Sequence, residues 1–277
     1  MQLSATDAVP QPLTATDAVP LQSSTADAIP QQLSATNAVP LRRLTATLRN
    51  GAQITWFNAA DENKAMAACA LDGDIEPVGS VVWPAGVAAI SALERLSNAR
   101  RGGLRGLSVL ELGAGTGLTA LAAAKFGARV VATDASELCL RLLRAARDAN
   151  PDLSFAVEKL DFSDVAAVEA LVRAKGPFDL VVACDTFYST ALAKATACAI
   201  ARAKATARLV LDPCRPTRPQ FVDELKRLEV ASWDGGADVA LPAVSMPEVG
   251  STVFSRASAW SKASRRPQPC RGPPPLR

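Results

Sequence analysis

The stretch VLELGAGTGLTALAAAKFGARVVATD, residues 109–134, sets three glycines between an apolar run and an alanine-rich run and ends on Asp134. This order predicts a strand, a tight loop, a helix and a second strand, the repeating unit of a parallel α/β sheet. Ligands of such sheets bind beyond the carboxyl ends of the strands. The loop 113–117 is therefore a candidate ligand site, because glycine lets a backbone approach a ligand closely and adopt conformations that side chains forbid.

Asp134 supplies a second indication of a ligand. It ends the second predicted strand about twenty residues beyond the loop, where a carboxylate can accept hydrogen bonds from a ribose diol. The glycines follow the spacing GxGxG and are preceded by Glu111, whereas dinucleotide-binding proteins prefer GxGxxG. The spacing therefore disfavours a nicotinamide dinucleotide, and a tight turn without any ligand is the alternative.

The same alternation extends along most of the chain. From Leu107 onward, short β-branched runs alternate with helical runs to give five strand-helix units, and the runs within 230–258 predict an antiparallel closing edge. Upstream, LTATLRNGAQITWFN (44–58) alternates polar and apolar residues around Asn50-Gly51, a pair favoured in a two-residue type I′ turn. The predicted fold class is α/β, with helices on both faces of a parallel sheet and a β-hairpin before it.

Composition excludes several kinds of chemistry. The chain of 277 residues is 49% hydrophobic, carries a net charge of +3 and contains no histidine. Histidine-based triads, nucleophile pairs and metal sites are therefore excluded, and no metal is expected. The six cysteines show no paired spacing, which favours a reducing, cytoplasmic compartment. No apolar run reaches the ~20 residues of a membrane helix.

Both ends of the chain differ in composition from the middle. Residues 1–40 form four ten-residue repeats, each ending in proline, and predict disorder. A plastid or mitochondrial transit peptide is the alternative. The acidic residues of this segment, and the absence of any arginine before Arg42, count against that interpretation. Residues 259–277 form a basic, proline-rich tail that also predicts disorder, with a weak nucleic-acid or acidic-partner contact as the alternative. The remaining segment, 41–258, is the predicted domain.

Five motifs in this order resemble a known family. VLELGAGTGL and VVATD resemble motif I and the acidic second-strand end of class I S-adenosylmethionine-dependent methyltransferases. VVWPAG (81–86), LDF (160–162) and CDTFY (184–188) are similar to the seven-β-strand protein-lysine methyltransferases, methyltransferase family 16. The resemblance covers about 44–258. It implies a Rossmann-like sheet of seven strands, S-adenosyl-L-methionine as cofactor, and methyl transfer to a lysine ε-amine of a protein substrate.

The resemblance also assigns site residues. Asp185 and Tyr188 match a DxxY motif that faces the methyl group and the incoming amine, so Asp185 is expected to bind the substrate ammonium and Tyr188 to pack the pocket. Phe162 replaces a tryptophan of the family and Cys184 replaces an alanine. LDPCR (211–215) is similar to a DPxR segment in the subset acting on electron-transfer flavoprotein. The expected cofactor-binding residues are Trp83, Glu111, Gly113, Ala114, Gly115, Asp134, Asp161, Phe162 and Cys184.

Methyl transfer to an amine suits a chain without histidine, because the protein must mainly align donor and acceptor and hold the amine neutral. The expected partner is a protein with an accessible lysine, with neither nucleic acid nor a membrane involved, and the expected state is a monomer. Adenine methyltransferases carry an Asn/Asp-Pro-Pro-aromatic motif at the position where this chain has DTFY. This difference disfavours methylation of a nucleic acid. The alternatives are a small-molecule amine methyltransferase of the same fold, a nucleotide-cofactor oxidoreductase, and a pseudoenzyme that binds cofactor without catalysis.

Overall fold

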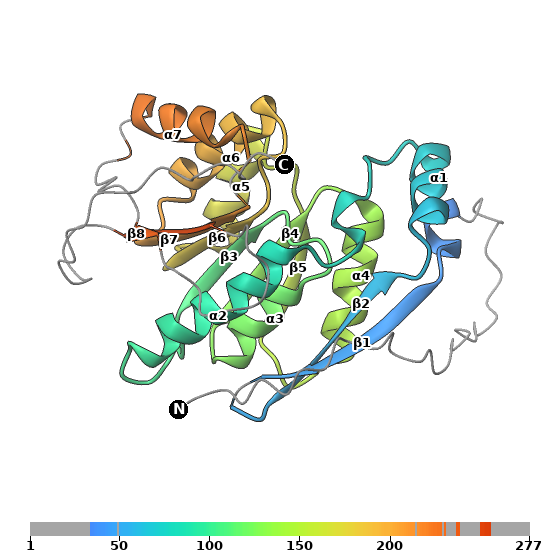
Figure 1. Cartoon of the computed structure of the whole chain (residues 1–277), viewed down its shortest axis with the longest axis horizontal. Coiled ribbons are helices and arrows are strands. Elements are labelled where there is room, and N and C mark those ends of the chain that lie inside the picture. Colours follow the sequence, from blue (N-terminus) through green and yellow to red (C-terminus); the bar gives the residue numbers. More distant parts are fainter. Residues whose placement is uncertain are drawn as a thin grey trace, which may run out of the picture.

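The computed structural model describes residues 34–48, 50–213, 215–228, 230, 237–238 and 250–255. Its centre is a sheet with the strand order β5-β4-β3-β6-β7-β9-β8 (Figure 1). The first five strands in this order are parallel, and β9 pairs antiparallel with β7 and with the two-residue β8. The strands are β3 Ser108–Leu112, β4 Arg129–Asp134, β5 Phe155–Lys159, β6 Leu180–Cys184, β7 Ala207–Asp212, β8 Ala237–Asp238 and β9 Gly250–Ser255. The predicted α/β fold class is confirmed.

Helices cover both faces of this sheet (Figure 1). Side chains alternate along β3, so that Val109 joins one core and Leu110 the other, as the pleat of a strand requires. The first core is closed by α2 Pro84–Asn98, α3 Leu118–Lys125 and α4 Glu137–Asp148. The second is closed by α5 Val165–Lys175, α6 Thr190–Ala203 and α7 Arg218–Arg227. Within the described residues, no helix combines the length and hydropathy needed to cross a membrane.

Polar caps fix where the helices begin at the carboxyl edge of the sheet. The helices α4, α5 and α6 follow β4, β5 and β6, and each starts from a side chain that accepts a backbone hydrogen bond. Ser136 accepts from the amide of Cys139 at 3.4 Å, Asp164 from Ala167 at 3.1 Å, and Ser189 from Leu192 at 3.2 Å. Such caps satisfy amides that lack partners within the helix, so the strand-to-helix loops are well defined.

The predicted hairpin is present, but its turn differs from the prediction. Strands β1 Leu41–Thr47 and β2 Gln53–Ala59 pair antiparallel, and β2 is tied to the end of α4 through two hydrogen bonds between the Asn150 side chain and the Thr55 backbone. The turn closes through a bond from the Gly51 amide to the Leu48 carbonyl. Asn50 and Gly51 are therefore not the two central residues, and the predicted type I′ turn is wrong.

The described structure extends upstream of residue 41. A short 3-10 helix, η1 Ala35–Ala38, packs beside α1 Glu62–Asp72, and Asp72 accepts hydrogen bonds from the amides of Ala35 and Thr36 at 2.9 and 2.7 Å. Val39 is only 2% exposed. These contacts order the end of the fourth repeat, because its backbone amides gain hydrogen-bond partners and Val39 buries its apolar side chain. The remaining predicted disorder, in 1–33 and 259–277, lies outside the described residues.

Candidate active site

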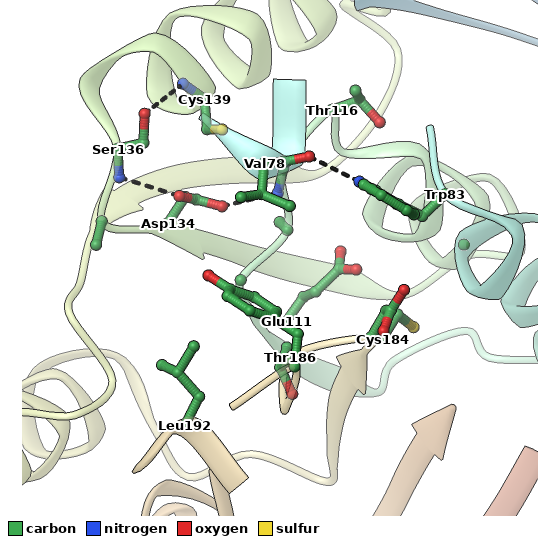
Figure 2. Close-up of a pocket in the computed structure, with 18 of the residues that line it drawn as sticks. Val78, Trp83, Glu111, Thr116, Asp134, Ser136, Cys139, Cys184, Thr186 and Leu192 are labelled. Carbon is green, nitrogen blue, oxygen red and sulfur yellow. Dashed lines mark hydrogen bonds between the residues drawn. The ribbon is translucent and has the colours of Figure 1, made fainter. Parts of the chain in front are cut away.

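A cavity of about 320 Å³ opens at the carboxyl ends of β3, β4 and β6 (Figure 2). This is the edge at which the sequence predicted a ligand. The structure brings every predicted site residue to its lining, although these residues come from segments far apart in the chain. They are Trp83, Glu111, Gly113, Ala114, Gly115, Asp134, Asp161, Phe162, Cys184, Asp185 and Tyr188.

The glycine loop needs its glycines for both backbone conformation and space. Gly113 and Gly115 have φ angles of 63° and 54°, a region that other residues enter at a cost. A Cβ on Gly115 would lie 2.7 Å from the carbonyl oxygen of Gly79, and one on Gly113 would lie 3.1 Å from a methyl group of Thr186. Gly79 belongs to η2, Val78–Ser80. The loop is therefore held between η2 and the segment after β6.

Asp134 braces this loop from the end of β4. Asp134 is 8% exposed, and its two carboxylate oxygens accept hydrogen bonds from the amides of Gly115 at 2.8 Å and Ser136 at 3.0 Å (Figure 2). Burial raises the pKa of Asp134. Because each carboxylate oxygen can accept a second hydrogen bond, the geometry is compatible with a diol ligand as well as with this structural role.

Glu111 lies deeper, at the end of β3. Glu111 is 2% exposed, and its Oε2 atom has no hydrogen-bond partner among the described residues. Burial raises the pKa of Glu111 to about 8, although the Thr119 side chain and the Ala120 amide oppose this shift. A buried carboxyl oxygen without a partner is unfavourable. A cationic group in the cavity, such as the ammonium of an amino-acid ligand, would satisfy it.

Two predicted residues lie at the carboxyl end of β5. Asp161 is exposed, and its carboxylate accepts hydrogen bonds from the amide and hydroxyl of Ser163 at 2.8 and 2.6 Å. Phe162 is half-buried against the second core, and its ring atom Cε1 would lie 3.5 Å from a Cβ on Gly113. An aromatic ring thus lies beside the glycine loop, and aromatic rings can stack on a nucleobase.

Trp83 and Cys184 line other parts of the cavity. Trp83 is 41% exposed, and its indole nitrogen donates to the carbonyl of Val78 at 2.7 Å (Figure 2). Cys184 accepts a hydrogen bond from Thr119 at 3.8 Å, and burial raises the pKa of its thiol well above the ordinary value. Because the thiolate is the nucleophilic form, this environment disfavours Cys184 as a nucleophile, and Cys184 lines the cavity.

The DxxY residues line the same cavity, together with a third residue, Arg215. Asp185 follows β6 with a φ of 55°, and its amide donates to the carbonyl of Leu211 at 2.8 Å. Its Oδ1 atom forms an ion pair with Nε of Arg215. The guanidinium carbon of Arg215 lies 6.0 Å from the centroid of the Tyr188 ring, and Tyr188 is 48% exposed.

A family model described as lysine methyltransferase matches residues 69–213, just over half of the chain. The chain belongs to the lysine methyltransferase family. The matched range contains the glycine loop, Asp134 and the DxxY motif, so the family resemblance seen in the sequence is confirmed.

Several curated proteins are similar to parts of this chain. Bovine protein-lysine methyltransferase METTL21E is 34% identical over 113 residues, 40% of this chain and 38% of that protein. Mouse protein N-lysine methyltransferase METTL21A is 34% identical over 113 residues, 40% of this chain and 49% of its own length. A 2-keto-3-deoxy-L-fuconate dehydrogenase of Xanthomonas campestris is 43% identical over 84 residues, 29% of this chain and 26% of the dehydrogenase. The matches thus span between about a quarter and a half of these relatives.

Two solved methyltransferases are similar to part of this chain. A Thermus thermophilus 16S rRNA N2 G1207 methyltransferase, solved with AdoMet and guanosine, superposes with a TM-score of 0.49 at 22% identity, covering 78% of this chain and 50% of the other. Magnesium protoporphyrin IX methyltransferase from Synechocystis superposes with a TM-score of 0.43 at 18% identity, covering 66% of this chain and 81% of the other.

The structure adds three residues to the predicted site residues. Gly79 contacts the backbone of Gly115, Ser136 donates to Asp134, and Arg215 pairs with Asp185. Gly79 has no sequence signal, because it meets Gly115 only in the fold. The contact of Ser136 with Asp134 is local, because the two residues are two positions apart. Arg215 had a signal in LDPCR, whose aspartate, Asp212, accepts a hydrogen bond from the Arg215 amide at 3.2 Å.

Glu111→Gln is expected to raise stability at pH 8 more than at pH 5. The folded-state pKa of Glu111, about 8, exceeds its ordinary value of 4.5. The stability that its buried neutral form provides is therefore complete below about pH 4.5 and is lost as the pH rises to about 8. Glutamine cannot ionise, so the variant does not lose this stability. Relative to the unmodified chain, its free energy of unfolding should rise by on the order of a few kcal/mol over that pH range.

Urea unfolding of both chains at pH 5 and pH 8, without any cofactor, measures this difference. Glu62→Gln, a change at an exposed acid in the first turn of α1, is the matched control and should show no such pH dependence. A Glu111→Gln difference that is equal at the two pH values would contradict the prediction.

Proposed function

We propose that this chain is an S-adenosyl-L-methionine-dependent methyltransferase that methylates the ε-amine of a lysine in a protein substrate. One observation carries the proposal: a single cavity joins the glycine loop and the buried carboxyl of Glu111, which suit a cationic nucleoside ligand, to Asp185 and Tyr188, which suit an amine. Membership of the lysine methyltransferase family supports the same activity.

The residues present fit the cofactor. The backbone of 113–115 would cradle its amino-acid and ribose portions, the unpartnered Oε2 atom of Glu111 would accept from its ammonium, and Asp134 would accept from its ribose diol. Phe162 and Asp161 would contact the adenine, with Trp83 and Cys184 completing the wall. When bound, S-adenosyl-L-methionine supplies a methyl group activated on a positively charged sulfur.

The chain's own residues must bind an ammonium and allow it to become neutral. A lysine with a pKa near 10.4 is neutral in only about 1 part in 2,500 at pH 7, an equilibrium cost of about 4.6 kcal/mol. The Asp185 carboxylate binds and orients the ammonium. Burial in the cavity lowers the amine pKa, and the proton leaves to water before attack. Tyr188, half exposed at the mouth, packs against the aliphatic part of the lysine.

An open mouth favours a lysine carried on a protein over a small free amine. Trp83 and Tyr188 are 41% and 48% exposed at the cavity, which leaves room for the backbone that carries a lysine side chain. The proposal includes a monomer in the cytoplasm that acts on neither nucleic acid nor membranes. The described cysteines, which are Cys69, Cys139, Cys184 and Cys198, are free thiols, as a reducing compartment requires.

Asp134→Ala is expected to weaken binding of S-adenosyl-L-methionine and S-adenosylhomocysteine at least tenfold. The variant removes the predicted diol acceptor and the partner of the Gly115 and Ser136 amides. A charge-assisted hydrogen bond contributes about 1.5–3 kcal/mol, which corresponds to roughly tenfold or more in affinity. Isothermal titration calorimetry of both sulfur ligands and of NAD measures the effect.

Asp152→Ala, at an exposed aspartate that pairs with Lys125, is the matched control and should bind like the unmodified chain. Circular dichroism of each variant separates lost binding from lost folding. Transfer of tritiated methyl to poly-L-lysine and to the proteins of a cell extract then tests the acceptor. Absence of binding by both sulfur ligands, or binding of NAD in their place, would overturn the proposed function.

A further inference from the structure

Four charged residues form a continuous chain at the carboxyl ends of β6 and β7. Arg218 donates from Nε to Oδ2 of Asp212 at 2.7 Å, and from Nη2 to the Asp212 carbonyl at 3.1 Å. Asp212 is 3% exposed, and its carboxylate also accepts from the Arg215 amide at 3.2 and 3.3 Å. Arg215 in turn binds Asp185. The backbone of Arg215 is therefore anchored before its side chain reaches the cavity.

Arg215 compensates a buried charge on the residue that is expected to meet the substrate. The side chain of Asp185 is 6% exposed, and that of Arg215 is 27% exposed. A buried carboxylate without a partner is strongly destabilising, and the Asp185 backbone already lies at a φ of 55°. The ion pair therefore keeps Asp185 in one position, with one carboxylate oxygen engaged by the guanidinium.

Arg215 also contacts the second DxxY residue. Its guanidinium carbon lies 6.0 Å from the centroid of the Tyr188 ring, within the range of a cation–π contact. Tyr188 is otherwise only half covered. One arginine thus touches both Asp185 and Tyr188, and nothing in the DxxY motif itself would have placed it there.

We propose that Arg215 is a positioning residue for methyl transfer, which holds Asp185 and Tyr188 together and offsets the carboxylate charge that faces the incoming amine. This inference rests on the proposed function. A lone carboxylate beside an amine favours the protonated, unreactive form. A carboxylate that is paired with a guanidinium can still accept a hydrogen bond from the ammonium. It favours the protonated form of the amine less than an unpaired carboxylate does, so the ammonium loses its proton more easily. Arg215 thereby allows Asp185 to bind the substrate without holding it in the charged state.

Tyr188 offers a direct measurement of this contact, because it is the only tyrosine in the chain. Absorbance of tyrosinate at alkaline pH therefore reports its pKa alone. Burial raises the pKa of Tyr188. The pKa is raised further by Asp134, Cys139 and Glu76, and it is lowered by the Arg215 cation. At about 6 Å in water, one charge shifts a pKa by about half a unit. Arg215→Ala is expected to raise the Tyr188 pKa by at least that amount.

Two further variants make the titration decisive. Asp185→Asn removes the anion that shields Arg215, so it is expected to lower the Tyr188 pKa, opposite in sign to Arg215→Ala. It also tests the pairing if Arg215→Ala fails to fold. Arg202→Ala, at an arginine that pairs with Glu169 outside the cavity, is the matched control and should leave the pKa unchanged. Circular dichroism at each pH restricts the comparison to folded protein.

Methyl transfer from S-adenosyl-L-methionine to poly-L-lysine tests the positioning role. Arg215→Ala is expected to lower kcat roughly tenfold to a hundredfold, to change KM for poly-L-lysine much less, and to move the acidic limb of the kcat profile about half a unit toward alkaline pH. Arg215→Lys restores a charge without the planar guanidinium. It should return the limb to its original pH but recover only part of kcat.

Failure of the proposed function and failure of the inference about Arg215 can be told apart. Binding of the sulfur ligands and methyl transfer by the unmodified chain test the proposed function. A Tyr188 pKa that does not change in Arg215→Ala and Asp185→Asn overturns the inference, whatever the activity. A changed Tyr188 pKa with an unchanged kcat and pH profile in Arg215→Ala also overturns it, because the contact would then be structural only.

Discussion

Replacement of Gly115 by alanine is expected to lower the melting temperature by on the order of 10 °C and to weaken S-adenosyl-L-methionine binding at least tenfold. The reason is the contact with η2. A Cβ on Gly115 would lie 2.7 Å from the carbonyl oxygen of Gly79 and 3.1 Å from its Cα atom. Both neighbours are backbone atoms, so no side-chain rotation relieves the overlap, and η2 must move away from the loop.

Two terms make up this expected loss. A residue other than glycine in the left-handed region costs about 1–2 kcal/mol, and overpacking a well-filled site costs about 1–3 kcal/mol. For a domain of this size each kcal/mol corresponds to roughly 2–4 °C. Movement of the loop also disturbs the bond from the Gly115 amide to Asp134, and cofactor affinity falls with it. Differential scanning fluorimetry with and without S-adenosyl-L-methionine measures both effects.

Gly51→Ala separates backbone strain from the clash. Gly51 has a φ of 80°, but a Cβ there would meet nothing within 4 Å. This control should lose only the few degrees that strain alone predicts and should bind the cofactor normally. If Gly115→Ala and Gly51→Ala behave alike, the contact between the glycine loop and η2 has no energetic importance, and the explanation fails.

Asp185→Asn is expected to lower methyl transfer to poly-L-lysine about a hundredfold, while S-adenosyl-L-methionine affinity changes less than threefold. Asparagine tolerates the left-handed backbone found at Asp185 and keeps the side-chain shape. It lacks the charge that orients an ammonium, and misplacement of a reacting group by about 1 Å can cost a hundredfold in rate. Tritium transfer gives the rate, and calorimetry gives the affinity.

Asp223→Asn is the matched control, because Asp223 is exposed on α7 and pairs only loosely with Lys226, at 3.5 Å. It should retain the full rate. An Asp185→Asn variant that retains full activity would remove Asp185 from the reaction. Loss of cofactor binding in that variant would instead assign Asp185 to cofactor binding.

The candidate site could be predicted closely because its residues sit at fixed places in repeating units. Gly113, Asp134 and Asp185 each stand at or just after the end of a parallel strand, and the carboxyl ends of parallel strands meet at one edge. The hairpin was predicted for a similar reason, since alternation of polar and apolar residues is local. The roles assigned to these residues remain proposals.

Other features depend on pairings between distant segments. The hairpin turn shifted by one residue, so that Gly51 lies at its end rather than its centre. Thr36 and Val39, in the fourth repeat, are buried through contacts with Asp72 and Arg141. Neither contact has a sequence pattern of its own.

The amino-acid sequence by itself determined the alternation of strands and helices from Leu107 onward, the glycine loop and the absence of histidine chemistry, because periodicity, glycine spacing and composition are properties of neighbouring residues. The family followed from the resemblance of five motifs. Only the tertiary structure decided that Gly79 closes on Gly115, that Glu111 keeps an unpartnered oxygen at the cavity, and that Arg215 pairs with Asp185. These features arise where separate segments pack together, and burial and charge compensation at such places depend on the whole fold.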